Sequence, residues 1–142
     1  MRVEELTSVD HKTVEAIQRL MSQLSTSAPP VTVDVMTSVV SSPVNTVFVA
    51  RDGDDIVGTL TLVVFPIPTG VRAWIEDVVV DESARGNGIG DDLIAAAVEK
   101  SQRLGARSID LTSRPAREAA HRLYLKAGFI VRETNVYRFS IE

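Results

Sequence analysis

The chain has 142 residues, 44% of them hydrophobic, which is enough to bury the core of one domain, and we expect residues 1–142 to form a single one. Lys and Arg number 15 against 19 Asp and Glu, so the net charge is −4 and no basic surface for nucleic acid or anionic lipid is expected. The sequence has no cysteine, which excludes disulfides, thiolate nucleophiles and zinc–sulfur sites, and its two histidines form no metal-binding pattern.

The amino-terminal part predicts a strand followed by two helices. Residues 1–12 are charged and lack the apolar core of a signal peptide, and no apolar run approaches the length of a membrane span, so we expect a cytoplasmic protein without a membrane partner. Met1–Leu6 is a candidate first strand, and Val9–Leu24 has the apolar spacing of an amphipathic helix. Two consecutive prolines end this helix. Val31–Ser41 is predicted as a second helix, although its many β-branched residues would suit a strand as well.

The remaining elements are predicted from hydrophobic periodicity and from glycine positions. An Asp-Gly step joins the first two of three consecutive strands, which is a hairpin signal. A helical stripe follows the third strand and ends at a glycine, and a strand, a last helix and a closing strand or hairpin complete the chain. The predicted ranges are Val44–Arg51, Asp55–Phe65 and Val71–Val80 for the strands, Ile89–Leu104 for the helix before Gly105, and Arg107–Thr112, Ala116–Ala127 and Phe129–Ile141 for the last three elements.

Three glycines, Gly86, Gly88 and Gly90, fall within five residues between the third strand and the helix that follows. Glycine brings no Cβ atom near a ligand and permits a turn whose N–H groups point inward, and the first amides of the next helix favour an anion. The spacing fits neither a Walker loop nor a dinucleotide fingerprint. A phosphate-binding loop is therefore predicted, with a glycine-rich turn that binds nothing as the alternative.

Two motifs carry a resemblance to a known family. The run Arg85-Gly86-Asn87-Gly88-Ile89-Gly90 resembles the acetyl-CoA pyrophosphate loop of the GNAT superfamily, the Gcn5-related N-acetyltransferases. The run Ala120-x-x-x-Tyr124-x-x-x-Gly128-Phe129 is similar to the family's second motif, at the right distance after the first. The resemblance implies an α/β (α+β) fold of order β-α-α-β-β-β-α-β-α-β, with a mixed, mostly antiparallel central sheet flanked by helices.

The resemblance also implies an activity and a cosubstrate. We expect an N-acetyltransferase that moves acetyl from acetyl-CoA to a primary amine, by direct attack in a ternary complex, since no cysteine is present to carry the acetyl group. The family's pyrophosphate loop corresponds to residues 85–90, and the backbone of Val78 and Val80 corresponds to the strand edge that binds pantetheine. A non-catalytic acyl-CoA-binding or sensor domain, or a structural module with an empty loop, remains an alternative.

Two catalytic residues are implied. Tyr124 matches the family tyrosine that acts as general acid toward the CoA thiolate, and its alternative role is packing against the sheet. Glu76 is the best placed carboxylate to take a proton from the amine, on the face of Val78 by the period of two, whereas Asp77 points the other way. The alternatives for Glu76 are a half-exposed strand residue or an anion that binds the acceptor; His121 is a further candidate base.

The sequence departs from the family pattern in one place. Many members have an asparagine that contacts the cofactor seven residues before the motif tyrosine, where this chain has Arg117. Arg114 or Arg117 is a candidate for a phosphate contact instead. The acceptor, a small-molecule or peptide amine, and the oligomeric state stay open, and a homodimer is compatible with the sequence.

Overall fold

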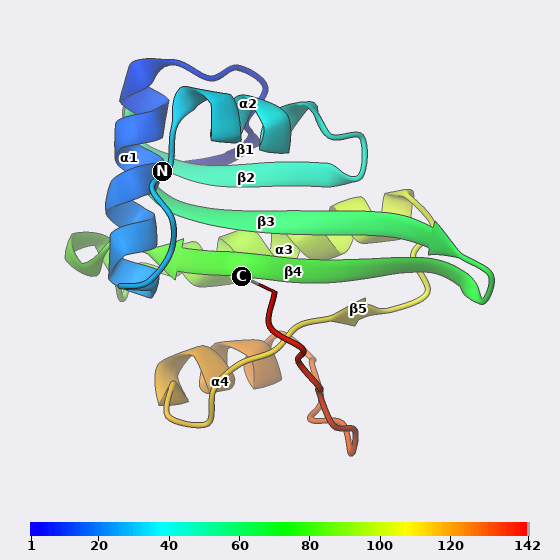
Figure 1. The fold of residues 1–142 in the computed structure, drawn as a ribbon. Helices are drawn as coiled ribbons and strands as arrows, with labels where there is room; N and C mark the ends of the chain where they lie inside the picture. Colours follow the sequence, from blue (N-terminus) through cyan, green and yellow to red (C-terminus); the bar gives the residue numbers. More distant parts are fainter. Residues whose placement is uncertain (142) are drawn as a thin grey trace. The chain divides into compact units, whose positions relative to one another are not determined.

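The computed structural model describes residues 1–141, which divide into two compact units, Met1–Thr112 and a second that begins at Ser113. The first unit contains a five-stranded sheet of order β1-β2-β3-β4-β5, in which the first four strands are antiparallel neighbours and β5 is parallel to β4 (Figure 1). The strands are β1 (Arg2–Glu5), β2 (Asn45–Asp52), β3 (Asp55–Ile67), β4 (Gly70–Val80) and β5 (Ile109–Asp110). The predicted mixed, mostly antiparallel sheet is confirmed.

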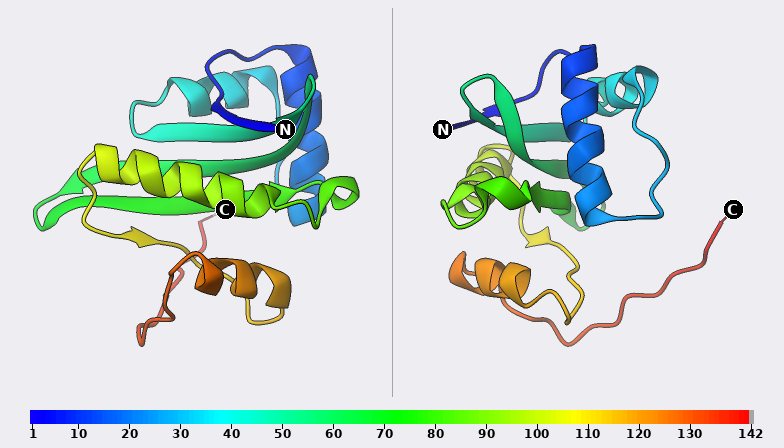
Figure 2. Two further views of the ribbon diagram at one scale, coloured as in Figure 1. Left: turned by 180° about the vertical axis from the view of Figure 1, so that it is seen from behind. Right: turned by 90° about the vertical axis from the view of Figure 1, so that its left-hand side faces the viewer.

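Helices cover both faces of this sheet. Helices α1 (His11–Leu24) and α2 (Val33–Ser41) lie on one face, and α3 (Ile89–Arg103) lies on the other (Figure 2). Because both faces are covered, the middle of β2 is buried without alternation from Val47 to Ala50. The core under α1 and α2 consists of Leu6, Ala16, Ile17, Leu20, Met36, Val47, Val49, Ile56 and Val79.

The α2 segment, whose β-branched residues suited helix or strand, is a helix. Its first turn is capped by Thr32, whose hydroxyl accepts a hydrogen bond from the N–H of Val35 at 3.1 Å. Met36 is the buried side chain of this helix and joins the core of the α1 face. Val39 and Val40 of the same helix also pack against this core, so capping and apolar contacts together outweigh the low helix propensity of valine and threonine.

The second unit contains α4 (Glu118–Lys126), which ends before Gly128 as predicted, with a φ of 104° at that glycine. Among residues 129–141 the structure assigns no strand, so the predicted closing strand or hairpin is wrong for the described part of the chain. Apolar residues in this segment permit a strand but do not supply the partner on which strand hydrogen bonding depends. The predicted strand Arg107–Thr112 is also shorter than expected, because β5 pairs with β4 through only Ile109 and Asp110.

Candidate active site

The glycine loop connects β4 to α3 through a short 3₁₀ turn, η1 (Glu82–Ala84). Gly86 and Gly88 have φ values of 85° and 75°, which side-chain-bearing residues rarely adopt, and Gly88 is the N-cap of α3 without a side-chain cap. A Cβ atom added at either glycine would meet no atom within 4 Å. Glycine is therefore needed at these two positions for their positive φ values and not to avoid a clash with the rest of the protein. The space next to the loop is open to a ligand.

The last two residues of the loop motif, Ile89 and Gly90, belong to α3. Gly90 lies in the first turn of the helix, and Ile89 as a whole residue is only 2% exposed. A Cβ added at Gly58 of β3 would lie 3.1 Å from Cγ2 of Ile89 and 3.3 Å from Cδ1 of Leu93. The first turn of α3 thus packs directly against β3 at Gly58. Glycine inside a strand often marks such a close approach, but Gly58 was not among the residues predicted to matter from the sequence. The Ile89 side chain is therefore packed inside the fold and does not face a ligand.

Two polar side chains stabilise the loop from within. The Nε of Arg85 donates to the carbonyl of Val80 at 3.2 Å, and the Nδ2 of Asn87 donates to the carbonyl of Ala84 at 3.0 Å. Both side chains belong to exposed residues. Of the residues predicted to contact a cosubstrate, Val80 therefore already has its carbonyl engaged by Arg85.

Asp81 lies between the end of β4 and the start of η1, where it is the N-cap residue of η1. The N–H and hydroxyl of Ser83, followed by the side chains of Arg19 and Gln23, lower the pKa of Asp81 to about 2 from its ordinary 3.8. This carboxylate is therefore ionised at neutral pH and tied to α1, a connection that the sequence did not predict.

The second half of β4 has one edge without a strand partner. The parallel pairing with β5 consists of Ala73 with Ile109 and Trp74 with Asp110. Beyond Trp74, no strand among the described residues pairs with β4 on the side of β5. This edge includes Val78 and Val80 and leads directly into the glycine loop, so its backbone groups have no strand partner among the described residues on that side.

A bulge interrupts β4 within this edge. The register of β3 and β4 shifts between Thr59 and Thr61, so that β4 has two residues, Asp77 and Val78, where β3 has one, Leu60. Asp77 has a φ of 53° and is the non-glycine residue with positive φ in the described chain. Aspartate tolerates this conformation better than most residues, and bulges of this kind often redirect side chains near active sites.

The bulge corrects one prediction about Glu76. Glu76 is opposite Thr61 and Val79 is opposite Thr59, and the two threonines share a face of β3. Glu76 therefore shares its face with Val79, three residues later, and the expected period of two that placed it with Val78 is wrong. The alternation fails because the extra residue at Asp77 shifts every side chain after it by one position.

Glu76 itself is exposed, on the sheet face covered by α1 and α2 rather than by α3. The indole Nε1 of Trp74 donates a hydrogen bond to Glu76 Oε2 at 2.9 Å. Asp77, next along the strand, is exposed as well. The structure thus places two carboxylates at the bulge, and one of them is held by a neighbouring donor.

Tyr124 lies in the second unit, on α4 one turn after Ala120. Its ring meets that of Phe129 edge-to-face with centroids 6.1 Å apart and an angle of 63°, and the N–H of Phe129 donates to the Tyr124 carbonyl at 3.0 Å. Burial raises the pKa of Tyr124 above its ordinary value of 10, and the charge of Arg117 opposes this only in part. The side chain is therefore a neutral phenol at physiological pH, able to donate a proton. Arg114, Arg117 and His121 are exposed residues of the same unit.

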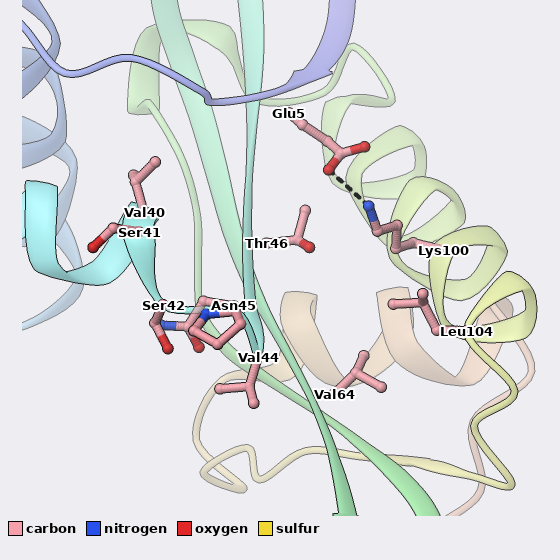
Figure 3. A pocket seen from close by; sticks show the side chains of 11 residues that line it. Glu5, Val40, Ser41, Ser42, Val44, Asn45, Thr46, Val64, Lys100 and Leu104 are labelled. Atoms are coloured by element: carbon pink, nitrogen blue, oxygen red, sulfur yellow. Dashed lines mark hydrogen bonds and ion pairs between the residues drawn. The ribbon is translucent and has the colours of Figure 1, made fainter.

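The first unit has two hollows, of which one lies away from the glycine loop and the other reaches Asp81 and Ser83 at the start of the loop. One, of about 480 Å³, lies where the end of α2 and the start of β2 approach α3, and Lys100 pairs with Glu5 at its rim at 2.9 Å (Figure 3). The other is lined by α1 and includes Arg19, Arg51 and Asp81. Neither lining contains Glu76 or residues 85–90. The candidate site therefore consists of a strand edge and a loop that neither of these hollows includes.

Among residues 1–141, no helix is both long and apolar enough to cross a membrane. Within the same range, no group of three His, Cys, Asp or Glu residues has the arrangement of a metal site.

Comparisons with known proteins agree with the geometry. Residues 15–129 match the family model described as the acetyltransferase (GNAT) family. A curated L-2,4-diaminobutyric acid acetyltransferase of Shouchella clausii (strain KSM-K16) is 33% identical over 82 residues, which cover 58% of this chain and 46% of that protein. The chain thus matches less than half of that relative's length.

Solved structures match nearly the whole chain. A Trypanosoma brucei acetyltransferase superposes with a TM-score of 0.79 and 26% identity, covering 99% of both chains. An aminoglycoside acetyltransferase from an uncultured soil metagenomic sample, solved in complex with sisomicin, superposes with a TM-score of 0.86 and 21% identity, covering 99% of this chain and 95% of its own. At such identities these structures show the shared fold.

Proposed function

Because the chain belongs to the GNAT family of acetyltransferases, we propose that it transfers an acetyl group from acetyl-CoA to a primary amine. The observation that carries this proposal is the junction of the open β4 edge with the glycine loop that begins α3. Acetyl-CoA has a pyrophosphate next to an extended arm with two amides, and a strand edge that continues into a helix N-terminus offers complementary donors and acceptors in that order.

The fit can be stated for each part of the cosubstrate. The backbone of residues 85–90 is proposed to hold the pyrophosphate, because Gly86 and Gly88 leave open space above it and the start of α3 has no side-chain cap. The pantetheine amides are proposed to bind the edge at Val78 and Val80, where side chains have no role beyond packing. Arg85 contributes to the loop by fixing the Val80 carbonyl.

Acetyl-CoA supplies a thioester that an amine attacks directly, and this chain is proposed to move two protons. Glu76 takes a proton from the attacking amine, directly or through one water, and its carboxylate is oriented for this by the Trp74 indole. When the C–S bond breaks, the Tyr124 phenol gives its proton to the departing sulfur. The burial that keeps Tyr124 protonated supports this role.

The acceptor is proposed to be a small molecule with a cationic amine. Glu76 and Asp77 place exposed negative charge at the bulge, which attracts an ammonium group before it is deprotonated. The names of two similar proteins, a diaminobutyric acid acetyltransferase and an aminoglycoside acetyltransferase, suggest the first classes to test.

The experiment is a thiol-release assay with acetyl-CoA and a panel of amines that includes 2,4-diaminobutyrate, an aminoglycoside, a polyamine and a lysine peptide. The proposal predicts turnover with at least one amine and a rise in Tm with acetyl-CoA alone. A rise in Tm without turnover across the panel would favour a non-catalytic acyl-CoA-binding domain. No change in Tm would overturn both.

A further inference from the structure

The start of the glycine loop is tied to α1 through Asp81. Oδ1 of this carboxylate accepts hydrogen bonds from the N–H and hydroxyl of Ser83, at 3.0 and 2.8 Å, which closes the first turn of the loop. Oδ2 accepts from the Nε of Arg19 at 3.2 Å. The Asp81 side chain is only 13% exposed, whereas the Arg19 side chain is 50% exposed.

A second α1 side chain, one turn later, reaches the same place. The Oε1 of Gln23 accepts a hydrogen bond from the N–H of Glu82, the first residue of η1, at 3.1 Å. The Nε2 of the same amide approaches Asp81 Oδ2 at 3.5 Å. Arg19 and Gln23 are four residues apart and therefore on one face of α1. Arg19 also donates to the carbonyl of Ile56 at 2.9 Å, which fixes its guanidinium on the adjacent strand.

We propose that Gln23 and Arg19 are positioning residues for the cosubstrate site, which set the angle at which the glycine loop leaves β4 by holding Asp81 and the N–H of Glu82. This inference rests on the proposed function of the loop. Preorganised backbone amides bind an anion tightly only when they need no rearrangement, so loosening the start of the loop weakens cosubstrate binding without touching the reacting atoms.

The chain offers a matched pair of variants for the test. Gln23→Met keeps the length and helix propensity of the side chain but removes both polar groups. Gln18→Met is the control, because Gln18 belongs to the same helix and its Oε1 accepts from the N–H of Val31 at 2.7 Å, away from the loop. We expect KM for acetyl-CoA to rise about three- to tenfold in Gln23→Met, the effect of one or two lost hydrogen bonds, with kcat and KM for the amine little changed. In Gln18→Met, KM for acetyl-CoA stays at the wild-type value.

Exchanging the amide and the carboxylate between positions 81 and 23 tests whether the lost affinity for acetyl-CoA can be restored. Asp81→Asn keeps an oxygen for Ser83 but presents an amide N–H₂ to Arg19 and Gln23, so it should raise KM for acetyl-CoA. Adding Gln23→Glu returns a carboxylate to the cluster, which accepts from the new amide at position 81, from Arg19 and from the N–H of Glu82. The double variant is expected to recover most of the affinity that Asp81→Asn loses.

Equal rises in KM for acetyl-CoA in Gln23→Met and Gln18→Met would overturn the inference, since both would then reflect a general loss of stability. Unchanged KM in Gln23→Met, or no recovery in the double variant, would also overturn it. Failure of the proposed function looks different, because then the wild-type protein itself shows no turnover with any amine, or no acetyl-CoA-dependent change in Tm.

Discussion

The indole Nε1 of Trp74 donates a 2.9 Å hydrogen bond to Oε2 of Glu76, two residues further along β4 and on the same face of the sheet. The bond joins the end of the β4–β5 pairing to the residue just before the bulge. A carboxylate with one fixed donor has fewer orientations than a free strand glutamate, which is a property expected of a positioned base.

Glu76→Gln is expected to lower kcat/KM most at neutral pH. The amide keeps the size and the bond to Trp74 but cannot accept a proton, and as pH rises more of the amine is already neutral, so part of the activity should return. Rates with one accepted amine, from about pH 6 to 10, check this. A role in acceptor binding predicts instead a higher KM, a largely retained kcat and no alkaline recovery.

Trp74→Phe is expected to lower kcat/KM in the wild-type background and to have little effect in the Glu76→Gln background. The phenyl ring keeps most of the packing while the N–H is lost, so any effect that passes through Glu76 disappears once Glu76 no longer acts as a base. The four enzymes of this cycle are compared at neutral pH. Equal losses in both backgrounds would assign Trp74 to packing alone.

Tyr124→Phe is expected to reduce kcat by roughly 100 to 10,000-fold with little change in acetyl-CoA affinity, because only the hydroxyl is removed and general acid catalysis is typically worth that much. The ring contact with Phe129 is retained. Since burial raises the pKa of Tyr124, the wild-type enzyme should keep this contribution at alkaline pH and lose it only above pH 10. A decrease of less than about threefold in kcat would contradict the general-acid role and indicate that Tyr124 only packs.

The contribution of Asp81 to the free energy of unfolding is expected to decrease at acidic pH. Its folded-state pKa of about 2 lies below the ordinary 3.8, so its contribution is fully present above the ordinary value and is lost as pH falls through about 2. The free energy of unfolding of wild type minus that of Asp81→Asn should therefore be constant near neutrality and shrink between about pH 4 and pH 2. Urea titrations at several pH values measure it, and a difference that does not change with pH would contradict the assignment.

The sequence predicted those features that short-range patterns determine. Gly86 and Gly88 have the positive φ values that glycine permits, and the helix after the loop ends where Gly105 was expected to end it, with a φ of 79°. Both depend on residues close together in the chain, where residue type and backbone conformation are directly linked.

Other features depend on partners far away in the chain and could not be predicted in this way. The side chain of Gln23 accepts a hydrogen bond from the backbone N–H of Glu82 across 59 residues, and no local sequence pattern at either residue indicates the other. The bulge at Asp77 depends on how β3 and β4 align, which a run of valines does not specify. The prediction of a closing strand or hairpin was wrong for the same reason, because the sequence of residues 129–141 does not by itself identify a strand partner.

The most direct test of the account is calorimetric titration of acetyl-CoA into wild type, Gly88→Val and Gly53→Val. Both glycines have positive φ, 75° and 61°, and both have open space where a Cβ would lie, so valine imposes comparable backbone strain at each. Gly53 lies in the β2–β3 turn, whereas Gly88 lies where the pyrophosphate is proposed to bind. The account predicts that Gly53→Val binds acetyl-CoA as wild type does and that Gly88→Val, still folded, shows no detectable binding. Equal affinity in the two variants would contradict the assignment of the loop.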